Sequence, residues 1–353
     1  MLKCKSNCKN VRKNPMAYKA AHNKYRELWK RDNGPMIGRW DIDYSYYSPV
    51  DYGADKNKKY PLCIILVGAL EGLFEGLEIQ ANEMPLWSDE KYQSRFTNGG
   101  AYLMIPRAPE EDGLYWDQSC LTESLKGAIL DFCKKHENVD MSRIYLLGWC
   151  LGSLGTVSLA AAYPELFAAT VLMAPDRAIT KSEASRLREM PVWMMGAKTD
   201  THSFYHFNVL PSWKLLCSTT NNRNNLRLTT YLRAVDVYLV QEVVAMGNHN
   251  LWDNVSEDMH FEGVPYDRDK IITGSYKGMK TVDGNGAVLY DPYIISWLCK
   301  YTNDGRSKIL TPELNTKPLE KAYVRFNETF MHEAHQKTLA VVCGIYRKLG
   351  WLK

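Results

Sequence analysis

The residues best suited to nucleophilic chemistry lie in the segment 143–167, RIYLLGWCLGSLGTVSLAAAYPELF. An apolar run typical of a buried strand leads directly into Gly148-x-Cys150-x-Gly152, and a helix rich in small residues follows. A nucleophile at so sharp a strand-to-helix turn has a strained backbone, so the residues that flank it must be small. The pattern predicts that the Cys150 side chain stands exposed, clear of the sheet, where the helix begins.

The start of a helix suits a thiolate, because a partial positive charge and N–H groups without intrahelical partners lie there. With an imidazolium nearby, this position lowers the pKa of a cysteine from about 8.5 toward the range of about 3.5 to 7.5 that reactive cysteines show. Two alternatives stay open. Cys150 is a buried structural cysteine, or Ser153, which lies one turn into the helix and follows Leu151 rather than a glycine, is the nucleophile.

The elements that must position this turn alternate between strand and helix. Each predicted strand is a short apolar run, and helical spacing of apolar residues separates several of them. The strands are predicted over 61–68, 101–106, 143–149, 169–175 and 191–196, and the helices over about 120–136, 150–162 and 181–189. This alternation implies right-handed crossovers and a parallel sheet with helices on both faces, which is the α/β class.

Other elements are predicted before and after this alternation. A helix is predicted over 15–31 and an aromatic strand over 39–47. A helix over 291–302 returns to the core, and residues 317–348 form one long helix or two.

Four sequence blocks resemble the α/β-hydrolase superfamily, and in particular its feruloyl-esterase and polyhydroxybutyrate-depolymerase-like esterases. The blocks are the lead-in strands (39–72), the strand–turn–helix with the strand after it (141–175), PVWMMGAKTDT (191–201) and GNHNLWDNV (247–255). The resemblance covers about residues 39–300. Cys150 stands where most members have serine, which is similar to dienelactone hydrolases. The sequence is equally compatible with a native cysteine and with cysteine in place of a native serine.

The resemblance implies a catalytic triad of Cys150, His249 as base and Asp200 as orienting acid. It also implies an oxyanion hole formed by the backbone N–H groups of Leu151, Ala69 and Leu70. His202, His206 and His260 remain alternatives for the base, and Asp236 remains an alternative for the acid.

The sequence departs from the family pattern at three places. Val67 replaces the usual histidine before the oxyanion loop, Glu71 lies near the expected oxyanion, and Asp200 follows Gly196 by four residues instead of the commoner three. A substrate pocket is expected to include Glu71, Trp149, His202, His206 and Trp252.

The domain organisation that follows has three parts. Residues 1–38 are an N-terminal helical extension, 39–302 are the α/β-hydrolase domain, and 303–353 are a C-terminal helical extension. Insertions at 201–245 and 253–290 follow the strands that should carry the acid and the base, so we expect them to cap the site. The terminal extensions either pack on the hydrolase body or mediate self-association. A homo-oligomer is therefore one of the alternatives that the sequence leaves.

The expected activity is hydrolysis of a small carboxylic ester, thioester or lactone through an acyl group on Cys150. A non-catalytic ligand-binding protein of this fold and an acyltransferase that uses the same cysteine are the alternatives. No cofactor and no metal site are expected, because HEAH (332–335) places two histidines three residues apart on a predicted helix and lacks a third ligand.

Composition excludes several other classes. The 44 Lys and Arg against 40 Asp and Glu give a net charge of +4, which is too small for a protein that binds nucleic acid by neutralising phosphates. No apolar run approaches the roughly 20 residues that span a bilayer, so no membrane partner is expected. Nine scattered cysteines, an odd number, indicate reduced thiols and a cytoplasmic protein.

Overall fold

The structure, a computed structural model, describes residues 25–68, 84–109, 116, 119–231, 249, 251, 280–289 and 294–304. The chain divides into two compact units, Met1–Ile309 and Leu310–Lys353. The second unit lies outside the described residues, and with it the helices predicted over 317–348 and the HEAH segment. None of the described helices has the length and apolar character that crossing a bilayer requires.

The described residues form ten strands, several helices and four short 3-10 turns, and the bounds of each element follow in chain order. They are β1 Lys30–Asn33, β2 Asp43–Tyr47, η1 Pro49–Tyr52, β3 Tyr60–Leu66, η2 Met84–Ser88, α3 Glu90–Gln93, η3 Thr97–Gly99, β4 Tyr102–Pro106, α4 Ser119–Lys135, β5 Val139–Trp149, α5 Leu151–Ala162, β6 Ala169–Met173, α6 Lys181–Arg186, β7 Val192–Ala197, α7 Val209–Thr219, η4 Arg223–Asn225, β8 Leu226–Tyr231, β9 Lys280–Asp283, β10 Val288–Leu289 and α10 Ile294–Leu298.

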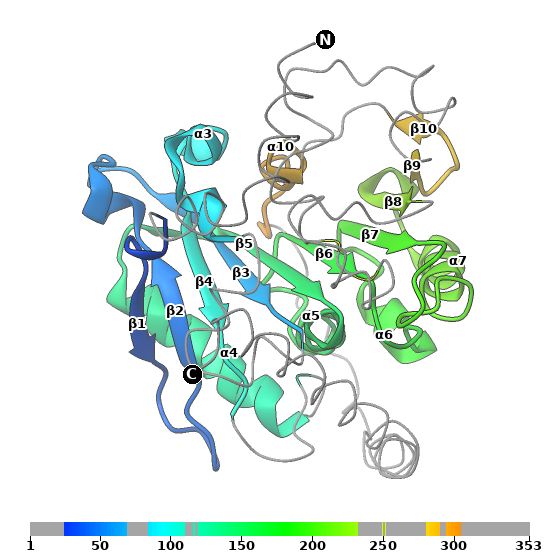
Figure 1. Ribbon diagram of the computed structural model, residues 1–353, viewed down its shortest axis with the longest axis horizontal. Helices are drawn as coiled ribbons and strands as arrows, with labels where there is room; N and C mark the ends of the chain where they lie inside the picture. The colour runs from blue at the N-terminus through cyan, green and yellow to red at the C-terminus, as the bar shows by residue number, and fades with distance from the viewer. Residues whose placement is uncertain are drawn as a thin grey trace, which may run out of the picture. The chain divides into compact units, whose positions relative to one another are not determined.

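The strands belong to one sheet, in the order β1-β2-β4-β3-β5-β6-β7-β8-β9-β10 (Figure 1). The central strands from β4 to β8 run parallel, whereas β1 and β2 at one edge and β9 and β10 at the other are antiparallel to their neighbours. Every residue of β3 is buried, as expected of a continuous apolar strand covered on both faces. The predicted α/β class with a largely parallel sheet is confirmed.

Helices cover both faces of this sheet (Figure 1). On one face, α4 contacts α5, α5 contacts α6, and α6 contacts α7, so that these four helices form a row. In β7, Val192 and Met194 belong to the core cluster that includes Val209 of α7. Trp193, between them, contacts Trp297 of α10, with ring centroids 5.3 Å apart. Because alternate side chains of a strand point to opposite faces, α10 lies on the face opposite α7.

Three sequence predictions need correction. The helix predicted over 15–31 does not reach its predicted end, because Lys30–Asn33 is a strand that pairs with β2, so the sheet begins before residue 39. The first 24 residues lie outside the described part. The predicted insertion at 201–245 contains a regular unit of the sheet, since α7 leads into β8 and β8 pairs in parallel with β7.

The predicted insertion at 253–290 ends in the antiparallel pair β9 and β10, and β9 pairs with β8. The pattern hid these strands because they lie near the edge of the sheet, where continuous apolar runs are not required. The remainder of both predicted insertions lies outside the described residues, apart from residues 249 and 251 between them.

The strand order explains where a site can form. Strands β3 and β4 are neighbours, yet the next strand in sequence, β5, lies on the other side of β3, so the order reverses between β3 and β5. Ligands of open α/β sheets bind beyond the carboxyl ends of the strands at such a reversal. Cys150 follows β5 directly at this edge.

Candidate active site

Cys150 occupies a strained turn between β5 and α5. Its backbone has φ 58° and ψ −124°, a conformation that non-glycine residues rarely adopt. The flanking glycines permit the turn: a Cβ on Gly148 would lie 2.3 Å from the carbonyl oxygen of Gly152, and one on Gly152 would lie 2.0 Å from that of Leu66. The small residues of the motif therefore have a steric cause, and the strained turn is present.

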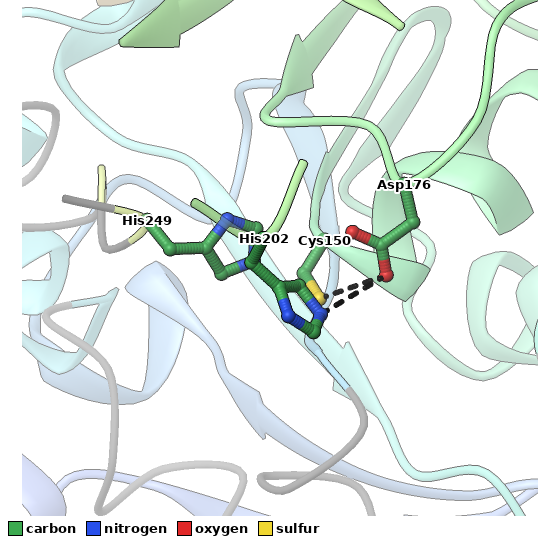
Figure 2. A group of neighbouring side chains, drawn as sticks. All are labelled: Cys150, Asp176, His202 and His249. Carbon is green, nitrogen blue, oxygen red and sulfur yellow. Dashed lines mark hydrogen bonds and ion pairs between the residues drawn. The ribbon is translucent and has the colours of Figure 1, made fainter. Parts of the chain in front are cut away.

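The Cys150 side chain is not exposed, contrary to the sequence prediction. Only 5% of the residue is accessible, and three polar side chains lie close to the sulfur (Figure 2). These are Asp176, His202 and His249, and one ligand atom from each lies within 4.8 Å of the others and of Sγ. The sulfur is thus placed among groups that can exchange protons with it.

His249 is held by Asp200. Its Nδ1 atom lies 2.8 Å from Oδ2 of Asp200, and both side chains are almost completely buried. The other carboxylate oxygen, Oδ1, accepts hydrogen bonds from the backbone N–H groups of His202 and Ser203 at 2.8 and 2.9 Å. These bonds fix the carboxylate, which in turn fixes the imidazole ring and leaves Nε2 available for chemistry.

The backbone and ring of His249 have a further support in Trp149. The indole N–H of Trp149 donates to the His249 carbonyl oxygen at 2.9 Å, and the two ring centroids lie 5.0 Å apart. Trp149, which is 4% exposed, thus supports the histidine, and its expected place in a substrate pocket stays a prediction.

Asp176 is the site residue that the sequence analysis missed. It follows β6 through Ala174, whose φ of 44° lies in the left-handed region, so the chain turns sharply as it leaves the strand. The Cys150 thiol donates a hydrogen bond to Asp176 Oδ2 at 3.2 Å. The Ser203 hydroxyl lies 2.7 Å from Oδ1 and holds the other side of the carboxylate. The position of Asp176 just after a buried parallel strand was the sequence signal that could have identified it.

His202 completes the cluster. Its Nε2 atom lies 3.8 Å from Asp176 Oδ2, and its ring centroid is 4.7 Å from that of His249 (Figure 2). His206, which was also expected in the pocket, is exposed, and its ring centroid lies 5.3 Å from that of Tyr205. Its place in a substrate pocket stays a prediction.

The pKa values of the two histidines of the cluster are shifted in opposite directions. Burial lowers the pKa of His249, but the hydrogen bond and charge of Asp200, with the charge of Asp176, outweigh burial and raise that pKa above its ordinary value. Burial lowers the pKa of His202, and the neighbouring His249 lowers it further, against the opposing charges of Asp176 and Asp200. The pKa of His249 is therefore shifted upward and that of His202 downward.

The remaining predicted residues have mixed outcomes. Leu151 is the first residue of α5, where N–H groups lack intrahelical partners, so its N–H lies beside the sulfur-bearing residue. Ser153, the rival nucleophile, is completely buried, and its hydroxyl has no hydrogen-bond partner in the described part of the chain. The other predicted residues lie outside the described part of the chain; they are Ala69, Leu70, Glu71, Trp252, Asp236 and His260.

Comparison with known proteins rests on structure. No family model and no curated protein matches the chain. A thermostable esterase matches with a TM-score of 0.54 and 21% identity over 67% of this chain, and the chain covers only 61% of that esterase. A ferulic acid esterase matches with a TM-score of 0.44 and 14% identity over 54% of this chain and 85% of its own. An acylaminoacyl peptidase matches with a TM-score of 0.41 and 13% identity over 54% of this chain and 35% of its own.

The likeness to the thermostable esterase has an identity of 21%, which shows a shared fold alone. Together with the parallel sheet and the strained turn after β5, it leads to one conclusion: the chain has an α/β-hydrolase-like fold.

Proposed function

We propose that this protein hydrolyses carboxylic esters, thioesters or lactones through an acyl group carried on Cys150. The single observation that supports this most is the convergence of three groups on one edge of the sheet. Cys150 lies on a strained turn, a nitrogen of His249 lies within 4.8 Å of its Sγ atom, and Asp200 binds the opposite side of the imidazole at 2.8 Å. A nucleophile, a base and a residue that orients the base are the parts that acyl transfer requires.

The first half of the reaction forms the acyl-enzyme. The thiol turns its S–H from Asp176 to Nε2 of His249, which takes the proton, and the thiolate attacks the carbonyl carbon. A carbon–sulfur bond forms while the π electron pair moves to oxygen, and the N–H of Leu151 is a donor for this oxyanion. The carbon–oxygen bond to the leaving group then breaks, and His249 returns its proton to the departing alcohol.

The second half releases the acid. His249 takes a proton from water, and the oxygen of that water attacks the thioester carbonyl, whose π electron pair moves to oxygen. As the carbonyl re-forms, the carbon–sulfur bond breaks, and His249 gives its proton to the sulfur, which restores the Cys150 thiol and releases the acid. A thiolate leaves more readily than most amines, so a tetrahedral adduct of an amide collapses back to substrate. Esters, thioesters and lactones are therefore the proposed substrate class.

The proposal is tested with a panel of p-nitrophenyl and aryl esters, followed by rapid mixing. We expect a burst of alcohol that matches the enzyme concentration, and mass spectrometry of the quenched protein that finds the acyl group on the peptide containing Cys150. Cys150→Ala abolishes both signals. Cys133→Ala, at a cysteine on α4, is the matched control and keeps both. An unchanged turnover in Cys150→Ala contradicts the proposal.

The identity of the base is tested separately, because His202 also lies in the cluster. We expect His249→Gln to lower kcat/KM by roughly 10²- to 10⁴-fold, the usual contribution of a positioned acid–base group. If His202→Gln has that effect and His249→Gln does not, His202 is the base.

A second candidate function is binding of a ligand without catalysis, and Asp176 is the observation that favours it. Its carboxylate lies 3.2 Å from the sulfur, where a negative charge disfavours both a thiolate and an oxyanion. Isothermal titration calorimetry with the same esters separates the two functions. Binding without release of alcohol, at any pH between 5 and 9, supports the ligand-binding protein.

A further inference from the structure

We propose that Cys150, Asp176, His202 and His249 form a binding site for a Zn²⁺ ion, and that this ion blocks the nucleophile. The four residues are drawn together in Figure 2, and one ligand atom from each lies within 4.8 Å of the other three. One thiolate, one carboxylate and two imidazoles are ligand types that zinc takes in tetrahedral sites. Mg²⁺ and Ca²⁺ prefer sites made of oxygen atoms, so the donor set selects against them.

The spacing is compatible with four-coordinate zinc. Even with every separation at its 4.8 Å limit, the centre of such a tetrahedron lies about 2.9 Å from each corner, whereas zinc bonds are about 2.0 to 2.3 Å long. A movement of less than about 1 Å by each ligand atom therefore closes the site. Side-chain rotation alone supplies movements of this size, so the strands need not shift.

His249 provides an independent indication of a ligand. Its Nε2 atom is buried and has no hydrogen-bond partner among the residues that the structure describes, and the residue is only 1% exposed. Asp200 holds Nδ1 at 2.8 Å, which is the arrangement of a histidine that binds metal through one nitrogen and a carboxylate through the other. A buried ring nitrogen without a partner is costly, and a bound cation removes that cost.

Asp176 is supported in the same way. Ser203 holds its Oδ1 atom at 2.7 Å, while Oδ2 faces the sulfur and Nε2 of His202. Outer partners of this kind fix the direction of a metal ligand. They also place a carboxylate where it hinders thiolate formation, a position that ester hydrolysis does not explain.

Charge favours a divalent cation at this centre. The ligands carry two negative charges when Cys150 is a thiolate and the histidines are neutral, and a divalent cation neutralises both. On binding, the Cys150 S–H bond breaks, the sulfur bonds to the metal, and the proton passes to solvent. The bound sulfur then shares one electron pair and its negative charge with the metal, and the ion covers it, so it is a weaker nucleophile toward a carbonyl. Inhibition rests on the proposed function, whereas metal binding does not.

Metal binding is tested on the full chain, reduced and treated with a chelator, by titration with Co²⁺. We expect absorption bands of cobalt bound to a thiolate in tetrahedral geometry, at one equivalent per chain. Added Zn²⁺ removes the bands and Mg²⁺ does not. The proposal is overturned if no thiolate–cobalt bands form, or if the bands persist unchanged in Cys150→Ser.

Variants identify the ligands. His202→Asn and Asp176→Asn, each checked for folding by circular dichroism, are expected to weaken Zn²⁺ binding in calorimetry by more than the roughly 10- to 100-fold that outer partners contribute. Ser203→Ala is expected to weaken it within that range. His206→Asn, at an exposed histidine four residues from His202, is the matched control and leaves the affinity unchanged. Equal affinity in His202→Asn, Asp176→Asn and His206→Asn contradicts the site.

Inhibition is measured last, as ester turnover at increasing Zn²⁺ with reversal by EDTA. Loss of turnover that EDTA restores supports inhibition, and turnover that rises with Zn²⁺ overturns it. If the protein hydrolyses no ester, the proposed function fails, while the cobalt bands and the calorimetry still decide whether the metal site exists.

Discussion

The Oδ2 atom of Asp176 lies 3.2 Å from the Sγ atom of Cys150, and the thiol donates its hydrogen bond to this carboxylate. Two side chains can therefore receive the proton of this thiol, since a nitrogen of His249 is also within 4.8 Å. The carboxylate stabilises the neutral thiol, whereas an imidazolium stabilises the thiolate. The reactivity of Cys150 thus depends on the balance between these two neighbours.

Asp176→Asn is expected to make Cys150 more reactive. The change removes a negative charge from a position where it disfavours the thiolate, and the thiolate is the species that alkylating reagents attack. We expect iodoacetamide to modify Cys150 about tenfold faster or more at neutral pH, measured by mass spectrometry of the Cys150 peptide. Asp41→Asn, at an exposed carboxylate, is the control. Slower modification in Asp176→Asn shows that the carboxylate activates the thiol.

Asp200→Asn is expected to lower both the activity and the pKa of His249. Burial alone lowers that pKa, and the hydrogen bond and charge of Asp200 are the main effects that raise it. We therefore expect kcat/KM to fall by roughly 10²- to 10⁴-fold and its acidic limb to move to lower pH. The measurement is the pH dependence of ester turnover. If the acidic limb of the pH profile does not move in Asp200→Asn, a group other than His249 is responsible for that limb.

The two histidines of the cluster are expected to titrate on opposite sides of 6.5, the ordinary value for histidine. The pKa of His249 is raised and that of His202 is lowered. Nitrogen-detected NMR of the imidazoles checks this order, with His249→Gln and His202→Gln to assign the signals. A lower pKa for His249 than for His202 contradicts the electrostatics of the site.

These directions also set the pH dependence of stability. A raised pKa means that the folded protein binds the His249 proton more tightly than the unfolded chain does, so this stabilisation is complete below pH 6.5 and is lost as the pH rises through the folded pKa. For His202 the stabilisation is present above pH 6.5 and is lost as the pH falls through the lowered pKa. Urea unfolding at pH 5.5 and pH 8 is expected to show that His249→Gln destabilises more at the lower pH.

Gly152→Ala is expected to destabilise the fold by about 1 to 3 kcal/mol or more, the usual cost of an overpacked core. The added Cβ would lie 2.0 Å from the carbonyl oxygen of Leu66 and 2.6 Å from that of Val67. These are backbone atoms, so α5 must move away from β3, and Cys150 moves with it. Urea unfolding measures the loss, with Ser158→Ala on the same helix as the control. A stability equal to that of the control contradicts the packing described here.

Local features of the sequence determined the strained turn and the central strands. The pattern Gly148-x-Cys150-x-Gly152 predicts the turn because its steric demands arise within a few residues. Continuous apolar runs such as β3 predict buried parallel strands for the same reason, since burial on both faces acts on each residue separately. The order of Cys150, Asp200 and His249 along the chain was also present in the sequence.

Only the tertiary structure decided what surrounds the sulfur. Asp176, His202 and His249 come from segments 26 to 99 residues beyond Cys150, and their meeting depends on which strands are neighbours and in what register. That β8 belongs to the sheet rather than to an insertion was decided in the same way, by its pairing with β7 on one side and β9 on the other. Composition and spacing reveal interactions between residues that are close in sequence. Pairing between strands that are distant in sequence brings a carboxylate and two imidazoles to a single thiol.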